Sequence, residues 1–550
     1  MERHPQTADR ATPSRATLVW LCLLCSLAMA YGWGWRGSYG HEAGAMFPGA
    51  LLGMAVCLAS GRPEWYRRTA AAGLFGAVGW AWGGGLSNME QTFYVVSDSF
   101  PDVLWAFGGV FLVGCLWSGI GSAILSLALT RPRSELNGFI GPLAVNGLAL
   151  FVAYLYFLIR PEDRSAINDW GKTHLHDIKY FAATIVLVVS AAYWLVRPKE
   201  RLQAGLFVQA VVAWWIGYLA FTRLGGIELA PPNRSEAWGG FVAVLAVLVA
   251  HLARTRNRAA VSMTLIGTLS GGLAFVAALF LTHPLVVRWG PFADTTITDT
   301  WKLTEESFGF FMGLGVALAV ARLLRGGLAP AAEDADRARL DEFSALVLLI
   351  VMMWMNLRGN VREWGQRYDV LPQHAIGGLF AWQWFLAVGL LLTALGLYVL
   401  WRMHCGTLGA ILPQSAFGKG ALLFLSVLWI GQFGVAIQRF AQWKSGANIF
   451  TEVTYWTLAT LTTWALLACA PDDAETTDQI AAMRDPCNPA WKLGKRYWLL
   501  WACVPVLLLA LTVGAMTIQQ APHVKGRLRF GPDAYWRLQL QKAQSEAGGG

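Results

Sequence analysis

Charged side chains are scarce in this sequence. Only 14% of its 550 residues are Asp, Glu, Lys or Arg, whereas charged residues make up about a quarter of a typical soluble domain. Hydrophobic residues reach 55%, and the mean hydropathy is +0.44. A soluble protein of this length exposes far more charge, so the composition excludes an ordinary soluble enzyme or binding protein.

The sequence also lacks the short motifs that hold nucleotides or activate water. It has no P-loop, no GxGxxG that opens a soluble βαβ unit, no HExxH and no GxSxG. Paired histidines within apolar segments, which would indicate haem, are missing as well. We therefore expect no bound cofactor, and this chain alone is not expected to drive transport with ATP.

Cysteine is present but is not arranged for disulfides or metal. All eight cysteines fall in apolar segments or on the expected inner side, where we interpret them as small buried apolar residues. Cys22 and Cys25 lie one helical turn apart within the first apolar segment, and no cysteine is placed for an external disulfide or a CxxC metal site. His174 and His176 lie two residues apart next to Asp177, but no further ligand is near in the sequence, so we predict a surface loop and no metal site.

What the sequence has is a long series of apolar segments of about twenty residues, the length of a helix that crosses a bilayer. We count about fifteen such segments, and we predict an all-α, polytopic integral membrane protein in a lipid bilayer. The first segment is interpreted as an uncleaved span and not as a signal peptide. The segments centre near residues 24, 52, 77, 117, 147, 186, 213, 245, 272, 316, 349, 390, 429, 461 and 507.

The connections alternate between two kinds. One kind is short and basic, as in "GRPEWYRRT" and "ARTRNRAA", and the other is longer and mixed, as in "SNMEQTFYVVSDSFPD". The positive-inside rule places the basic set in the cytoplasm. The rule predicts an inner (plasma) membrane protein with a cytoplasmic tail at 1–15 and an external tail at 519–550. The net charge of +9 belongs to these connections, so we expect no nucleic-acid partner.

Two stretches of the sequence resemble each other. "EAGAMFPGALLGMAV" begins at Glu42 and "ESFGFFMGLGVALAV" begins at Glu306, and the segments that follow, "WGGGLSNMEQ" and "WMNLRGNVREW", also match in part. We infer two repeats, 16–225 and 255–518, joined by a linker span at 226–254. Equivalent spans are an even number apart, so the repeats are predicted to be parallel.

Polar residues gather where spans reach the outer side. Glu42 and Glu306 each stand at the start of a span, where a carboxylate needs a cationic partner or water. Arg36 and Arg358 are the candidate partners. Pro48 lies early in the span after Glu42 and is expected to kink it, which is typical of helices that line a cavity.

These polar residues form the predicted binding site, and we expect them to line one outward-open cavity between the repeats. Arginine, amide and carboxylate side chains near aromatic rings suit a hydrophilic small molecule, either sugar-like or anionic. Most of the 28 tryptophans are instead assigned to the interfacial belts. The predicted binding residues are Arg36, Glu42, Asn88, Glu90, Glu306, Arg358, Asn360 and Glu363.

Two classes of function fit this pattern. A secondary transporter is favoured, with Glu42 and Glu306 as coupling carboxylates, although few polar residues other than Asn146 and Gln432 lie within spans. The alternative is an outward-facing enzyme with Glu42 and His41 as catalytic residues. In the position of this carboxylate alone, the chain resembles polytopic glycosyltransferases that use polyprenyl-phosphate sugars. A sensor or assembly subunit, and a purely structural role for the Arg/Glu pairs, stay open.

Overall fold

The computed structural model describes most of the first two thirds of the chain and parts of the last third. The described residues are 13–36, 42–84, 86, 94–175, 177, 179–229, 236–287, 289–292, 300–328, 338–355, 390–391, 393–394, 397–398, 401, 415–441 and 449–471. Within these ranges the regular structure is helical and no β-strand is found, as the sequence predicted.

The helices lie where the apolar segments were predicted. A helix crosses every predicted centre from residue 24 to residue 349, and also those at 429 and 461. The helices are α1 Arg15–Arg36, α2 Glu42–Leu58, α3 Pro63–Tyr66, α4 Thr69–Gly83, α6 Phe100–Thr130, α7 Arg133–Asn137, α8 Ile140–Ile159, α9 Pro161–Leu175, α10 Tyr180–Val196, α11 Arg201–Gly217, α12 Trp238–Arg254, α13 Arg258–Val286, α14 Thr300–Arg325, α15 Ala338–Leu346, α18 Ala416–Ala441 and α19 Ile449–Ala468. Short 3-10 turns lie at Pro198–Glu200 and Gly290–Phe292, and π-helical turns extend α11 over Tyr218–Leu224 and α15 over Val347–Val351.

Length and hydropathy select fewer membrane spans than the sequence predicted. Among the described residues, six helices are long and apolar enough to cross a bilayer, or seven if the bent pair α9 and α10 is one span. Residues 43–58 of α2, α12, and residues 416–432 of α18 are apolar but shorter. The total of fifteen therefore stays a prediction, and the span predicted near 507 lies outside the described residues.

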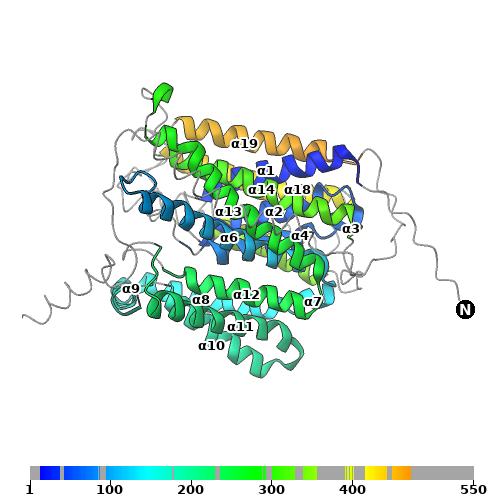
Figure 1. Ribbon diagram of the computed structural model, residues 1–550. Helices are drawn as coiled ribbons and strands as arrows, with labels where there is room; N and C mark the ends of the chain where they lie inside the picture. Colours follow the sequence, from blue (N-terminus) through cyan, green and yellow to red (C-terminus); the bar gives the residue numbers. More distant parts are fainter. Residues whose placement is uncertain are drawn as a thin grey trace, which may run out of the picture.

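The helices run side by side and form two layers (Figure 1). The larger layer contains α1, α2, α4, α6, α13, α14, α18 and α19, and the smaller one contains α8, α10, α11 and α12. Helix α12 packs against both α6 and α11 and so joins the layers. Helices from both proposed repeats pack directly, α1 with α14 and α6 with α13. The repeat itself stays a prediction.

Glycines allow the closest helix contacts. Where α6 crosses α13, a Cβ added to Gly114 would lie 2.3 Å from the carbonyl oxygen of Gly271. A Cβ added to Gly49 in α2 would likewise lie 2.3 Å from the carbonyl oxygen of Gly76 in α4. Backbones approach this closely only through small residues, which is the usual packing of helices in membranes.

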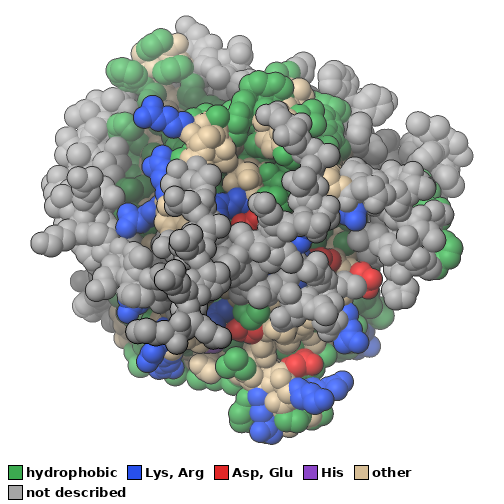
Figure 2. All heavy atoms as spheres, turned by 90° about the vertical axis from the view of Figure 1, so that its right-hand side faces the viewer, with side chains coloured by type: hydrophobic (Ala, Val, Ile, Leu, Met, Phe, Trp, Pro, Cys, Tyr) green, Lys and Arg blue, Asp and Glu red, His purple; other side chains and the backbone are tan. Residues whose placement is uncertain are grey.

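The two ends of the helix bundle differ in charge. At the end that holds α3 and α7, called the basic end here, basic side chains greatly outnumber acidic ones, and Figure 2 shows Lys and Arg spread over this face. Its basic residues include Arg15, Arg62, Arg67, Arg68, Arg131, Arg133, Arg197, Lys199, Arg201, Arg254, Arg256, Arg258, Arg322, Arg325, Arg339 and Lys419, and its acidic residues include Glu64, Glu135, Glu200, Asp341 and Glu342. At the opposite end, acidic residues are as prominent as basic ones, with Asp98, Asp102, Glu162, Asp163, Asp169, Asp177, Glu228 and Glu236 beside Arg160, Arg164, Lys172, Lys179 and Arg223.

The smaller layer turns large apolar side chains outward. On α8, Leu148, Phe151, Val152 and Ile159 are all exposed. A soluble monomer rarely exposes an apolar face of this extent. The surface therefore fits a helix that faces lipid, in agreement with the prediction of a multi-pass membrane protein.

Candidate functional site

Arg36 is buried in the bundle and is ion-paired. It is the last residue of α1, only 4% exposed, and its Nη1 lies 3.3 Å from Oε1 of Glu305 on α14. The sequence placed Arg36 in an external connection and proposed it as a partner for Glu42 or Glu306. The described contact is instead with Glu305, because α1 continues as a helix through Arg36 and packs along α14.

Lys302 completes a small network around the end of α1. Its Nζ donates to the carbonyl oxygen of Gly34 at 3.0 Å and lies 3.4 Å from Oε2 of Glu305. The hydroxyl of Tyr455 on α19 donates to the same Gly34 carbonyl. Carbonyls in the last turn of a helix have no partner within the helix. One such carbonyl therefore joins α1, α14 and α19.

Glu306 follows Glu305 on α14 and is also buried. Its Oε1 accepts a hydrogen bond of 2.9 Å from Oγ1 of Thr454 on α19. The missing side chain of Gly34 makes room for Glu306, since a Cβ there would lie 2.6 Å from the Glu306 Cγ. The sequence predicted a cationic partner or water for Glu306, whereas the described contact of its Oε1 is with a hydroxyl group.

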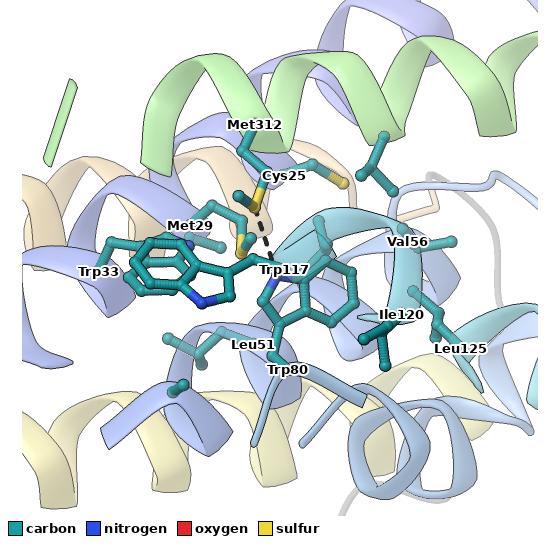
Figure 3. Packing of buried hydrophobic residues seen from close by; sticks show 14 of the residues in the cluster. Cys25, Met29, Trp33, Leu51, Val56, Trp80, Trp117, Ile120, Leu125 and Met312 are labelled. Atoms are coloured by element: carbon teal, nitrogen blue, oxygen red, sulfur yellow. Dashed lines mark hydrogen bonds between the residues drawn. The ribbon is translucent and has the colours of Figure 1, made fainter. Parts of the chain in front are cut away.

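Aromatic rings surround the guanidinium of Arg36. Its Cζ lies 5.3 Å from the ring centroid of Trp33 and 5.1 Å from that of Trp117, and the two indoles stack 4.7 Å apart. Figure 3 shows this pair within the core, next to the Trp80 indole that donates to the sulfur of Met312. Cation–π contacts of this kind stabilise a guanidinium that has lost its water.

The two stacked indoles keep unused donors. In the part of the chain that the structure describes, neither Nε1 of Trp33 nor Nε1 of Trp117 has a hydrogen-bond acceptor, although both are buried. Buried donors nearly always find an acceptor in the protein, in water or in a ligand. The neighbourhood of Arg36 therefore offers two N–H groups to an acceptor from outside the chain.

The network lies between the ends of the bundle and not at its rim. From Thr130 at the basic end, α6 reaches Trp117 after roughly 20 Å and continues to Phe100 for roughly another 25 Å, at a rise of 1.5 Å per residue. The short helices α2 and α4 do not extend as far, and Gly83 at the end of α4 packs against Trp117. The sequence predicted these charged groups at the outer ends of spans. The structure places them deeper inside the bundle.

The mid-span amides differ in their contacts. The amide nitrogen of Asn146 donates to Oγ of Ser190 and to the carbonyl of Pro142, both at 2.9 Å, and so fastens α8 to α10. Gln432 on α18 is fully buried, and neither its nitrogen nor its oxygen has a partner among the described residues. It follows Gly431, whose carbonyl accepts a hydrogen bond from the indole of Trp35.

Of the predicted binding residues, the structure describes the side chains of two, Arg36 and Glu306. Glu42 begins α2, but its side chain is not described, so only Arg36 and Glu306 of the set have described contacts. His41, Asn88, Glu90, Arg358, Asn360 and Glu363 lie outside the described residues. Sequence reasoning missed Lys302 and the role of Glu305. Their spacing of three residues on one helix, "KLTE", is the signal that indicates such a pair.

Glu228 is a buried carboxylate outside the membrane-spanning helices, in the connection between α11 and α12. It is 5% exposed. Burial raises the pKa of Glu228 to about 8, and the nearby Arg223 lowers it only in part. The folded protein therefore holds this proton far more tightly than the unfolded chain does.

This carboxylate predicts a pH dependence of stability. Because the folded pKa is above the unfolded value, stability is highest at low pH and falls as the pH rises from about 5 to about 8, where the group loses its proton. Glu228→Gln is expected to remove most of the slope that Glu228 contributes in this interval, measured as melting temperature against pH. Glu162→Gln, at an exposed carboxylate, is the matched control. An unchanged slope in Glu228→Gln would contradict the assignment.

The described residues contain no group of three or more His, Cys, Asp or Glu side chains arranged to hold a metal ion. The groups available for binding a ligand around Arg36 are therefore its ion pairs, the aromatic rings and the unpaired indole N–H donors. A fold of packed helices does not by itself name a function. No protein-family model, no curated protein and no solved structure matches this chain, so similarity to known proteins assigns it to no family.

Proposed function

We propose that this protein is a secondary transporter for a hydrophilic small molecule, sugar-like or anionic. The observation that carries the proposal is the buried network of Arg36, Lys302 and Glu305, with Glu306 beside it, between α1, α14 and α19. Ionisable groups are costly inside a membrane protein, and where they occur they commonly mark the path of a substrate or ion.

The chemistry of the network fits an oxygen-rich ligand. The guanidinium of Arg36 and the free indole donors of Trp33 and Trp117 are suited to carboxylate, phosphate or hydroxyl oxygens. Glu306 supplies a carboxylate for a coupling proton or cation. In this proposal the ligand binds beside the stacked indoles, and Glu42 is the second coupling carboxylate.

The charge of the two ends supports an orientation for the transporter. We infer that the basic end faces the cytoplasm, because basic residues near span ends are retained there. The network, beside Trp117 near the middle of α6, then lies about midway between the two aqueous phases. Fifteen spans, two parallel repeats and an outward-open cavity between them are the further parts of the proposal.

The enzyme alternative has less support. It depends on His41 and Glu42 as catalytic residues, whereas the transport proposal uses Arg36, Glu305 and Glu306, whose contacts are described. The contacts of Arg36 and Glu305 do not require a lipid-linked substrate. Transport is therefore the function that the described geometry favours.

The test begins with a search for the ligand. Purified protein is heated in the presence of hexoses, sugar acids, dicarboxylates and sugar phosphates, and compounds that raise the melting temperature are tested for uptake into proteoliposomes. Saturable uptake and counterflow of at least one compound are expected. Binding without any uptake or counterflow would contradict transport and favour an enzyme or a sensor.

Glu306→Gln is expected to separate binding from coupling. It keeps the size and the hydrogen-bonding partner of the side chain but removes its charge. Accumulation driven by a proton or sodium gradient should fall about tenfold or more, equivalent to about 1.4 kcal/mol or more, while counterflow is retained. Glu162→Gln, at an exposed carboxylate, is expected to transport normally. Gradient-driven uptake equal to wild type would exclude Glu306 as the coupling group.

A further inference from the structure

Gln432 on α18 is an amide with unused hydrogen-bonding capacity inside the bundle. It is 0% exposed, and in the part of the chain that the structure describes neither its amide nitrogen nor its amide oxygen has a hydrogen-bond partner. Burying an amide without hydrogen bonds is costly, and buried polar groups of folded proteins nearly always have a partner. We therefore expect a molecule from outside the chain to supply the missing hydrogen bonds.

Contacts between α18 and α1 place this amide at the level of Arg36. The hydroxyl of Tyr31 donates to the carbonyl oxygen of Leu428 at 3.3 Å. One turn further along α1, the indole of Trp35 donates to the carbonyl oxygen of Gly431 at 3.2 Å. The two helices therefore run in the same direction, side by side in the larger layer (Figure 1). The next residues along them are Arg36 on α1 and the amide-bearing residue on α18.

Gln432 lies on the inner face of α18. It is one helical turn from Leu428, and both residues are 0% exposed, so they share the face that packs against α1. Helix α1 ends at Arg36. A small molecule over this end can therefore reach α18 on one side and the ion pair between Arg36 and Glu305 on the other.

The described charges of the network favour a neutral ligand. Its two cations, Arg36 and Lys302, are matched by two carboxylates, Glu305 and Glu306. An anion would add an uncompensated charge inside the bundle, which is costly, whereas a neutral molecule leaves this balance unchanged.

The chemistry of the Gln432 amide favours hydroxyl groups. Its nitrogen donates hydrogen bonds and its oxygen accepts them, and a hydroxyl group can do both. The oxygens of a carboxylate or phosphate ion only accept, so they would leave the amide oxygen unpaired. A ligand with several hydroxyl groups satisfies both atoms of the amide.

We propose that Gln432 binds hydroxyl groups of the substrate, and that the substrate is a neutral, sugar-like molecule and not an anion. This inference rests on the proposed transport function and narrows its substrate class. The amide nitrogen donates to one hydroxyl oxygen, and the amide oxygen accepts from another hydroxyl. The network around Arg36 binds the rest of the molecule over the end of α1.

The first test measures the full-length, ligand-free protein in detergent. Gln432→Met keeps an unbranched side chain and removes the amide. Because this amide has no partner to lose, the melting temperature should rise by about 1–3 °C. Asn146→Leu is the matched control, since the Asn146 amide donates to Ser190 and Pro142, and its melting temperature should fall. A fall in both Gln432→Met and Gln432→Leu would overturn the proposal, because the amide would then have a structural partner.

The second test measures binding by the shift in melting temperature. Glucose, galactose and mannose are each compared with glucuronate, galacturonate and mannuronate, which keep the ring but carry a carboxylate. At least one neutral sugar should stabilise the wild type in a saturable manner, and its acid should bind about tenfold more weakly or less. Gln432→Met should weaken binding of this sugar about tenfold. Asn146→Leu should bind it as the wild type does.

Three results of the binding test would overturn the proposal: no neutral sugar binds, the acids bind as tightly as the neutral sugars, or Gln432→Met keeps the wild-type affinity. These results differ from a failure of the transport proposal. Binding of a neutral sugar through Gln432 without uptake contradicts transport and keeps the binding assignment. Uptake of an anion at the wild-type rate in Gln432→Met keeps transport and overturns the assignment.

Discussion

Glu305→Gln is expected to lower the free energy of unfolding by about 3–5 kcal/mol, the usual cost of removing one partner from a buried ion pair. Glu305 faces both Arg36, at 3.3 Å, and Lys302, at 3.4 Å. Glutamine leaves both cations inside the bundle without their shared counterion. Neither can reach water easily, because the network is buried between α1, α14 and α19.

The measurement is the melting temperature and the extent of SDS-induced unfolding in mild detergent. A drop of on the order of 5 °C is expected for a chain of this size. Glu162→Gln is the control, since its pair with Arg160 is exposed, at 62% and 57%, and exposed pairs contribute about 0–1 kcal/mol.

A double-mutant cycle shows how much of the effect belongs to the ion pair. Arg36→Gln combined with Glu305→Gln should be less destabilised than the sum of the single variants, by at least about 1 kcal/mol. Strict additivity would mean that Arg36 and Glu305 do not interact, whatever the single variants cost. A Glu305→Gln protein as stable as the wild type would contradict the buried network itself.

The sequence predicted the helices well because their signal is local. A run of apolar residues long enough to cross a bilayer must satisfy its backbone hydrogen bonds internally, so it is a helix wherever it occurs. Basic connections likewise predicted which helix ends share one face of the bundle. These statements need no knowledge of how one helix packs on another.

The site was harder to predict because it depends on helix packing. The partner of Arg36 is 269 positions away, and nothing local distinguishes Glu305 from its neighbour Glu306. Only the rotation of α14 against α1 decides that Glu305 meets the guanidinium while Glu306 meets Thr454. The depth of the network was also missed, because the sequence does not tell that α2 and α4 are shorter than α6.

Gly114→Ala is expected to destabilise the protein by about 1–3 kcal/mol, although alanine is the better helix former. The added Cβ would lie 2.3 Å from the carbonyl oxygen of Gly271 and 3.1 Å from the Cα of Gly272. Both are backbone atoms and cannot rotate away, so α6 and α13 must separate. Gly108→Ala is a control on the same helix, with nothing within 4 Å of its Cβ, and should stabilise by about 0.5–1 kcal/mol.

The decisive result is that Gly114→Ala lowers the stability of the protein whereas Gly108→Ala raises it. Thermal unfolding of both variants gives it directly, and equal effects would show that α6 and α13 do not pack through Gly114. The crossing also supports the site, because Trp117 follows Gly114 by one turn and its ring stacks on Phe275 of α13. Separating the helices moves the ring that faces Arg36. Gly114→Ala should therefore also change the tryptophan fluorescence of the folded protein, whereas Gly108→Ala should not.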